Sequence, residues 1–264
     1  MNTPAVTDGC LIGARDVVKT FGATAALRGA SVSAARGEIL AIMGPSGSGK
    51  STLLHCLAGI FAPDQGEVTF DGQRLDTLSE AERTKLRRTK FGFVFQFGQL
   101  VPELTAADNV ALPLLLNRTR RKVAYKTADA WLDKLGIGDK GGRRTGELSG
   151  GEAQRVAVAR ALALAPGAVF ADEPTGSLDS LTGEKVMDLM TGLAREQGTT
   201  VVIVTHDVRV AAYADRVVMV RDGLVTSDFG SVPATAASRA SGPAESRAQS
   251  PASGPAASSA KAAQ

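Results

Sequence analysis

A glycine-rich segment between an apolar run and a helical pattern places the tightest constraint on what this chain can fold into. The run Gly37 to Met43 has the composition of a buried strand, and the pattern from Ser51 to Ile60 is that of a helix. Between them, Gly44 to Ser51 fits the spacing G-x-x-x-x-G-K-[ST], in the strand-to-helix context that this phosphate-binding motif requires. The pattern therefore predicts a nucleotide site at the end of a buried strand.

The chemistry of phosphate binding explains the residue types in this segment. Glycines let successive backbone N–H groups turn toward phosphate oxygens, and the following helix presents its positive N-terminal end to them. We expect Lys50 to reach the β- and γ-phosphates and the Ser51 hydroxyl to ligate Mg²⁺. A ligand-free turn is the alternative, and the matching lysine, hydroxyl and context disfavour it. The residues predicted to contact the nucleotide are Gly44, Pro45, Ser46, Gly47, Ser48, Gly49, Lys50, Ser51 and Thr52.

Three further apolar runs predict the rest of a central sheet. They are Phe91 to Phe95, Ala168 to Ala171 and Thr199 to Thr205, and polar residues follow each of them. Short runs of this kind are typical of strands buried on both faces, so we expect a mostly parallel sheet covered by helices. The other expected elements are helical stretches at 107–135 and 152–164 and short antiparallel strands at 31–35 and 67–72.

The order of these elements predicts an α/β fold with a P-loop NTPase core, an antiparallel β subdomain and a helical insertion. The insertion is expected between the second and third of the four strand candidates in sheet order, so that it interrupts the sheet. The expected ATPase domain spans residues 1–230, with a helical subdomain at about 99–163. Residues 231–264 are rich in Ala, Ser, Pro and Gly and hold no aromatic residue, which predicts a disordered tail.

Composition and charge exclude several classes of protein. The 264 residues are 44% apolar and 22% charged, typical of a globular chain rather than a fibrous or disordered one. Two cysteines do not make a disulfide framework, and a reducing compartment is favoured. Most of the net charge of +3 lies in the predicted tail, so the folded part offers no basic face for nucleic acid. No segment approaches the roughly 18 apolar residues of a membrane span, so a membrane role would require a partner.

A second strand end carries the acidic residues that a nucleotide site needs. Asp172 and Glu173 directly follow the run Ala168 to Ala171. We expect Asp172 to hold Mg²⁺, directly or through water, and Glu173 to act as general base toward the attacking water. Taken alone, such a pair is more often a helix start or a loop feature, and the phosphate loop upstream makes it the expected catalytic pair.

The segment Leu148 to Ala157 resembles the signature sequence of the ABC ATPases. Ser149 can cap the helix that follows, while Gly150 and Gly151 expose backbone N–H groups at its positive end, which makes the segment a second anion site. An ordinary capped helix is the alternative for this segment taken alone. The resemblance covers about residues 10–228 and implies binding and hydrolysis of ATP with Mg²⁺.

Further positions resemble motifs of the same family and occur in its order. Gln96 resembles the glutamine that senses nucleotide and Mg²⁺, and His206 the switch histidine that contacts the γ-phosphate. The segment Ser177-Leu178-Asp179 resembles the D-loop, which implies nucleotide contact for Asp179. Phe21 occupies the place of the aromatic that stacks on adenine, where many relatives use tyrosine. Two alternatives assign no nucleotide contact to these residues. Gln96 is then simply exposed at the end of a strand, and His206 makes a structural hydrogen bond.

The stretches 91–96, 100–110 and 112–116 look like those of the lipoprotein-release and macrolide-export branch. This resemblance implies a separate transmembrane permease with an extracytoplasmic domain. ATP hydrolysis by this chain would then drive export or mechanotransmission through that permease. The resemblance also implies a peripheral position at the cytoplasmic face of the cell membrane, with the segment just after Gln96 contacting the permease. In this family two subunits form a head-to-tail homodimer around two ATP molecules.

Two other functions are compatible with the same motifs. One is a regulatory ATPase of the cell-division type, which signals through a permease-like partner without transport. The other is a soluble DNA-repair or chromosome ATPase, a class that usually adds long coiled coils or zinc-binding cysteine pairs, which this sequence does not contain. The cargo and the direction of transport do not follow from the sequence, because the permease mainly selects the cargo.

Overall fold

A six-stranded, mostly parallel sheet forms the centre of the computed structural model, which describes residues 9–229. The strand order is β10-β9-β3-β8-β7-β6, and among these strands only β10 and β9 pair antiparallel. The predicted parallel core is therefore confirmed. The strands are β3 (Ile39–Met43), β6 (Phe91–Phe95), β7 (Ala168–Asp172), β8 (Thr200–Thr205), β9 (Arg216–Arg221) and β10 (Leu224–Phe229).

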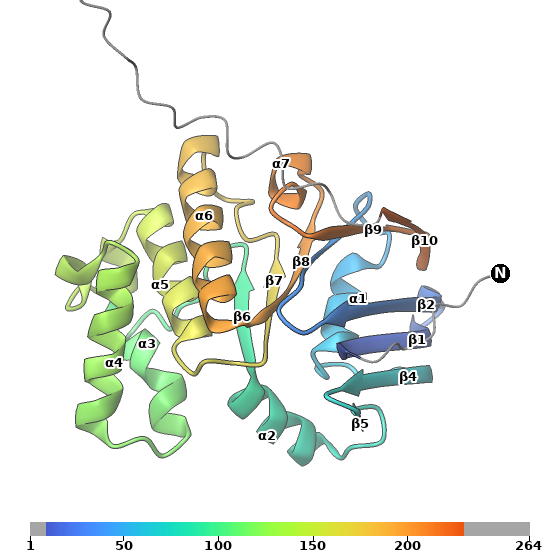
Figure 1. Cartoon of the computed structure of the whole chain (residues 1–264), viewed down its shortest axis with the longest axis horizontal. Coiled ribbons are helices and arrows are strands. Elements are labelled where there is room, and N and C mark those ends of the chain that lie inside the picture. The colour runs from blue at the N-terminus through green and yellow to red at the C-terminus, as the bar shows by residue number, and fades with distance from the viewer. Residues whose placement is uncertain (1–8, 230–264) are drawn as a thin grey trace, which may run out of the picture. The chain divides into compact units, whose positions relative to one another are not determined.

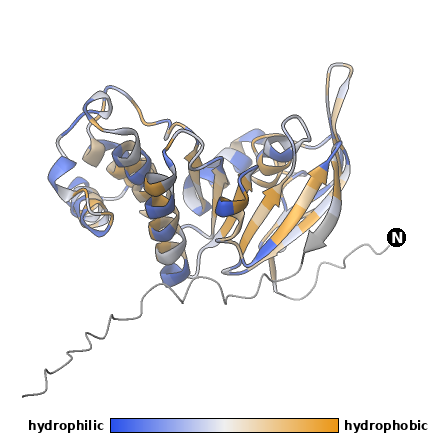
Figure 2. Ribbon diagram, turned by 90° about the horizontal axis from the view of Figure 1, so that it is seen from above, coloured by the Kyte–Doolittle hydropathy of each residue, from blue (hydrophilic) through white to orange (hydrophobic). Residues whose placement is uncertain are grey.

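The central strands are largely apolar because helices and a second sheet cover both of their faces. Along β3, Ile39 and Ala41 pack into one hydrophobic core, and Leu40 and Ile42 into another. The first core contains helices α3 to α6, and the second contains α1 and the antiparallel sheet (Figure 1). The strands carry much of the hydrophobic colour in Figure 2, whereas hydrophilic residues mark the exposed faces of the helices. The helices are α1 (Lys50–Leu57), α2 (Glu80–Lys90), α3 (Ala106–Leu116), α4 (Arg121–Lys134), α5 (Gly150–Leu162), α6 (Ser180–Gln197) and α7 (Val208–Ala211), with short 3₁₀ turns at Gly138–Lys140 and Thr145–Glu147.

The antiparallel sheet is larger than the sequence pattern predicted. Its order is β2-β1-β4-β5, and the first two strands are each 12 residues long. The strand expected at 31–35 begins earlier, at Thr24. The prediction was too short because small and half-buried residues hide the alternation of apolar and polar side chains along this strand. The strand expected at 67–72 ends at Phe70, since Asp71 and Gly72 both have positive φ and form the hairpin turn into β5. The strands are β1 (Cys10–Phe21), β2 (Thr24–Ala35), β4 (Gln65–Phe70) and β5 (Gln73–Arg74).

The helical insertion does not interrupt the sheet as expected. It lies between the second and third strand candidates along the chain, but these strands, β6 and β7, pair directly from Phe91↔Ala168 to Phe95↔Asp172. The chain therefore leaves the edge strand, forms α3, α4 and α5, and returns beside it (Figure 1). Across residues 9–229, each helix is too short or too polar to cross a bilayer. The predicted tail, 231–264, lies outside the described residues.

The hairpin of β9 and β10 was not predicted. Asp222 and Gly223 join the two strands and have φ angles of 50° and 78°. Positive φ at both central residues matches a type I′ turn, for which Asp-Gly is a favoured sequence. Because β9 pairs with β3 on the side opposite β8, the hairpin extends the sheet next to the phosphate loop.

The close approach of β6 to α5 predicts contrasting effects of two glycine substitutions. A Cβ at Gly92 would overlap the carbonyl oxygen of Ala161, whereas a Cβ at Gly192, in the middle of α6, would meet no described atom within 4 Å. We expect Gly92→Ala to lower the free energy of unfolding by about 1–3 kcal/mol through overpacking. Gly192→Ala should raise it by about 0.5–1 kcal/mol, because alanine loses less backbone entropy in a helix.

Urea denaturation of the two variants and the unmodified chain measures both changes. Equal stability of the two variants would contradict the packing described for β6.

Candidate functional site

The carboxyl ends of three neighbouring strands bring the predicted site residues together. The register pairs Met43 of β3 with Thr205 of β8, and Val204 of β8 with Asp172 of β7. The residues that follow these strands therefore emerge at one edge of the sheet. Gly44, Glu173 and His206 come from segments far apart in the sequence and meet there, as ligand-binding residues of open α/β sheets do.

The phosphate loop is held in a conformation that only glycine permits at two positions. Gly44 has φ 152° and Gly49 has φ 102°. A Cβ at Gly44 would overlap the carbonyl oxygen of Val220 in β9, and one at Gly49 would lie 2.5 Å from the carbonyl oxygen of Ala26 in β2. The backbone N–H of Gly223, in the β9–β10 turn, also donates to the carbonyl oxygen of Ser48 over 2.9 Å. The two sheets and this hairpin thus determine the course of the loop.

The interior of the loop fits a bound phosphate. Ser48 Oγ is buried and has no hydrogen-bond partner among the described residues. Lys50 is only 7% exposed, and its ammonium donates one hydrogen bond, to the Pro45 carbonyl oxygen at 2.9 Å. Within the described chain, α1 starts at Lys50 without a side-chain cap, so backbone N–H groups of its first turn can donate to an anion. The exposed rim of the loop consists of Pro45, Ser46 and Gly47, and Thr52 follows in the helix.

A hydroxyl and a carboxylate meet beside this loop. Ser51 Oγ donates to Asp172 Oδ1 over 3.1 Å, although the residues are 121 positions apart. Burial raises the pKa of Asp172, and the hydrogen bond from Ser51 opposes that shift. Residues 9–229 contain no cluster of three or more His, Cys, Asp or Glu side chains that could hold a metal alone. The pair nevertheless fits Mg²⁺, which takes few protein ligands and completes its shell with phosphate oxygens and water.

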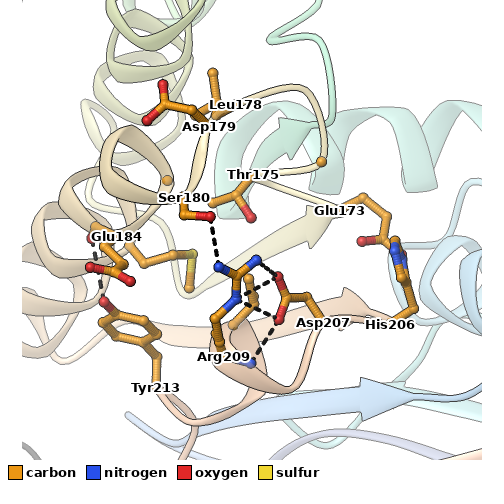
Figure 3. A pocket seen from close by; sticks show the side chains of 14 residues that line it. Glu173, Thr175, Leu178, Asp179, Ser180, Glu184, His206, Asp207, Arg209 and Tyr213 are labelled. Carbon is orange, nitrogen blue, oxygen red and sulfur yellow. Dashed lines mark hydrogen bonds and ion pairs between the residues drawn. The ribbon is translucent and has the colours of Figure 1, made fainter.

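Glu173 and His206 form a second contact at the same edge (Figure 3). His206 Nδ1 lies 2.7 Å from Glu173 Oε1, and Thr205 Oγ1 donates to Glu173 Oε2 over 3.3 Å. Glu173 has φ 48°, an uncommon conformation for a residue other than glycine, and its N–H donates to the Val204 carbonyl. The histidine is 68% exposed while the glutamate is 19% exposed, so the imidazole lies on the solvent side of the carboxylate.

Gln96 lies where β6 ends and touches the loop that follows Glu173. Its carbonyl oxygen accepts a hydrogen bond from Ser177 Oγ at 2.6 Å, and its side chain packs against Gly176. Gln154 Nε2 donates to the carbonyls of Phe95 and Pro174, at 3.0 and 2.7 Å. One buried glutamine of α5 thus joins the end of β6 to the loop after β7.

The remaining predicted residues do not converge on the phosphate loop. Ser149 caps α5 in a reciprocal capping box with Glu152, and Asp179 caps α6 by accepting from the Thr182 N–H. The hydrogen bonds of the Ser149 side chain within residues 9–229 all go to Glu152. Gly150 and Gly151 begin the same helix, which packs on the sheet face opposite α1. The start of α5 is thus capped within its own chain, away from the phosphate loop.

Phe21 lies at the end of β1, with 45% of its surface exposed. The ring of Phe61 packs edge-on against it, with centroids 5.4 Å apart, and Lys19 Nζ lies 5.6 Å from the Phe21 centroid. A partly exposed aromatic ring of this kind is suited to stacking on a flat base. Phe21 belongs to the antiparallel sheet, whereas the phosphate loop follows β3 of the central sheet.

Sequence reasoning missed three supporting residues: Thr205, Gln154 and Phe61. Thr205 directly precedes His206, at the last position of a buried strand, and its polarity there was a usable signal. Gln154 is itself buried on a helix, where an amide must find partners. Phe61 gave no signal, because its role depends on the distant Phe21.

Comparisons with known proteins agree with this geometry. The family model described as "ABC transporter" matches residues 27–176. The lipoprotein-releasing system ATP-binding protein LolD of Porphyromonas gingivalis is 43% identical over 218 residues, which cover 83% of this chain and 100% of LolD. LolD of Hydrogenovibrio crunogenus is 48% identical over 200 residues, covering 76% of this chain and 87% of the relative.

Solved structures of ATP-binding cassettes are similar as well. The dimeric post-hydrolysis state of the cassette MJ0796 with ADP and Pi aligns with a TM-score of 0.76 and 40% identity, covering 83% of this chain and 98% of that one. CbiO1 of Clostridium perfringens aligns with a TM-score of 0.77 and 30% identity, covering 84% and 89%. With matches over most of its length and the motifs in the family's order, the chain belongs to the ABC transporter ATPases, in the LolD-like branch.

Proposed function

We propose that two copies of this chain form a head-to-tail ATPase that drives a separate membrane permease from the cytoplasmic face of the cell membrane. The observation that carries the proposal is the meeting of the phosphate loop, the Ser51–Asp172 pair and the Glu173–His206 pair at one edge of the sheet. These are the parts that phosphoryl transfer to water needs: an anion cradle, a metal site and a base.

ATP binding follows from the arrangement of the loop and the exposed aromatic ring. The adenine stacks on Phe21, and the phosphates lie against the backbone N–H groups of the loop and the free donors of Lys50. Ser51 and Asp172 would hold Mg²⁺, joined by Gln96, and the ion supplies positive charge that offsets the charge of the phosphates. The unpartnered hydroxyl of Ser48 supports this placement, because a buried donor gains a partner when phosphate binds.

Hydrolysis is assigned to the Glu173–His206 pair. The Glu173 carboxylate accepts a proton from the water that attacks the γ-phosphate, and its hydrogen bond from Thr205 holds it in place. His206 contacts the same carboxylate, so it can orient the base and donate to the γ-phosphate when its exposed ring swings toward the nucleotide. The left-handed backbone at Glu173 turns its side chain back toward the strand ends.

A second copy is needed because one chain holds the two halves of the site apart. The start of α5, with Ser149, Gly150 and Gly151, provides backbone donors and a positive helix end, yet it lies on the other side of the sheet from α1. In a head-to-tail pair this helix end closes over ATP held by the partner, and Asp179 approaches the same interface. The dimeric form of MJ0796 supports this arrangement.

A groove between α2, β6, α3 and α5 supports a permease contact beside the segment just after Gln96. Its apolar lining includes Phe93, Phe95 and Leu116, and three arginines border it. Arg160 donates to the carbonyls of Gly98 and Gln99, each at 2.8 Å, so the groove is tied to that segment. The other lining residues are Ile60, Thr84, Arg87, Arg88, Phe91, Gly92, Gln99, Leu112, Pro113, Ala161 and Leu164. We infer that a permease segment with apolar residues and an acidic end fits there.

The general-base assignment predicts the behaviour of Glu173→Gln. We expect this variant to bind ATP with unchanged affinity and to hydrolyse it at least about 100-fold more slowly, because the amide cannot accept the proton. Glu184→Gln is the matched control, since Glu184 lines the same pocket but is exposed and lies away from the Glu173–His206 contact (Figure 3). Unchanged hydrolysis by Glu173→Gln in a phosphate-release assay would remove Glu173 from the base role.

The shared-site proposal predicts that Ser149→Arg blocks dimerisation in ATP. A bulky cation at the start of α5 would fill the space that the partner's ATP occupies. Ser79→Arg is the control, because Ser79 caps α2 with the same kind of capping box to Glu82. Light scattering of Glu173→Gln protein carrying each change gives the mass with and without ATP, and a Ser149→Arg dimer would contradict the model.

The permease contact predicts that Leu116→Glu separates membrane binding from ATP hydrolysis. Leu116 is 55% exposed in the groove, and Val123, exposed to a similar extent on α4, is outside it. We expect Leu116→Glu to lose sedimentation with native membranes, while Val123→Glu sediments like the unmodified chain and both hydrolyse ATP normally. Equal sedimentation of the two variants would exclude the groove. Mass spectrometry of the co-purified permease would separate an export system from a cell-division partner.

A further inference from the structure

Arg209 connects two segments that the proposed mechanism uses but that the strands alone do not join. Its Nη1 donates to Ser180 Oγ over 2.7 Å, and its Nη2 donates to Asp207 Oδ2 over 2.7 Å. The Nε also lies 3.2 Å from both Asp207 oxygens. Figure 3 shows the guanidinium between the two side chains, inside the pocket that Glu173 and His206 border.

Each end of this bridge lies next to a residue assigned to the nucleotide. Ser180 is the first residue of α6 and follows Asp179, which caps that helix. Asp207 follows His206, and its backbone N–H donates to Thr205 Oγ1 over 3.0 Å. Thr205 Oγ1 in turn donates to Glu173 Oε2. A continuous set of contacts therefore runs from the start of α6 through Arg209 to the loop that holds His206 beside Glu173.

The contact of Arg209 with Asp207 and Ser180 is suited to fixing the relative orientation of these side chains rather than to raising the stability of the whole fold. The planar guanidinium presents several donors at fixed angles, so it can engage a carboxylate and a hydroxyl together, which a lysine ammonium does less well. The hydrogen bonds from the Arg209 side chain hold the pKa of Asp207 below its usual range. Because the arginine side chain is 62% exposed, the pair contributes little to global stability.

We propose that Arg209 is a positioning residue for ATP hydrolysis, which ties the His206 loop to the start of α6 so that the two move as one unit. The inference rests on the proposed roles of His206 and Asp179. The Arg209 side chain makes no hydrogen bond to His206 or Asp179 among the described contacts. It acts through Asp207 and Ser180. Its loss lets the His206 loop move independently of the helix, so Glu173 and His206 meet in the hydrolytic arrangement less often.

A matched control is available at the other end of α6. Arg195, in the last turn of α6, donates to Asp215 Oδ1 over 2.9 Å and to the Tyr213 carbonyl over 3.2 Å. It is partly exposed and joins an aspartate to a second oxygen acceptor, as Arg209 does, but it lies at the opposite end of α6 from Asp179. Arg195→Ala therefore removes a comparable ion pair without disturbing the His206 loop.

Steady-state kinetics of the full chain test the proposal. We expect Arg209→Ala to lower kcat for ATP about fivefold, the effect of losing roughly one ordinary hydrogen bond, while KM changes less than twofold. Ser180→Ala should lower kcat in the same direction, and the double variant should be no slower than Arg209→Ala alone, because both remove one connection. Arg209→Lys should not restore the rate. Arg195→Ala should match the unmodified chain in kcat. The melting temperature of every other variant should lie no further from that of the unmodified chain than the melting temperature of Arg195→Ala does.

A second readout does not depend on hydrolysis. The chain has two histidines, so ¹H–¹⁵N spectra of the imidazoles resolve His206 from His55, whose pKa burial lowers. We expect Arg209→Ala to shift the His206 ring signals and leave those of His55 in place. Unchanged His206 signals, unchanged kcat or additive effects in the double variant would overturn the proposal. An unmodified chain that fails to hydrolyse ATP would instead count against the proposed function, and the His206 signals would still decide whether Arg209 holds the loop.

Discussion

The in-register pairing of β3, β8 and β7 is the constraint on which the rest of the site depends. Because Met43 pairs with Thr205 and Asp172 with Val204, the three strands end almost level, and the residues after them share one edge. A shift of one residue in either pairing would turn the apolar side chains of a strand to the wrong core and carry the candidate site residue that follows it away from the others. Burial on both faces makes such a shift costly, so the hydrophobic core and the candidate site are specified by the same contacts.

Much of the central fold could be predicted from the sequence because its strands are buried on both faces and therefore largely apolar. The phosphate loop could be predicted because glycine, lysine and hydroxyl residues occur together at a spacing that few other structures use. The antiparallel sheet was underestimated, since small residues at half-buried positions weaken the alternation on which such predictions depend. The expectation that the helical insertion interrupts the sheet was wrong, because apolar patterns carry no information about which strands are neighbours.

The candidate site was predicted as separate motifs, and the structure adds the contacts between them. The proximity of Ser51 to Asp172, or of His206 to Glu173, cannot be read from spacing, because each pair is brought together by the sheet. Arg209 gave no sequence signal, since an arginine on a short helix is most often a solvated surface residue. Supporting residues of this kind are recognised only when both of their partners are located.

The contact between the β9–β10 turn and the phosphate loop has a consequence for the order in which the protein can mature. Ser48 receives its hydrogen bond from Gly223, and the Val220 backbone closes the space beside Gly44. A chain emerging from the ribosome thus exposes its phosphate loop some 170 residues before the strand that braces it has been made. The phosphate loop therefore acquires its braced conformation only once the nearly complete domain has been made.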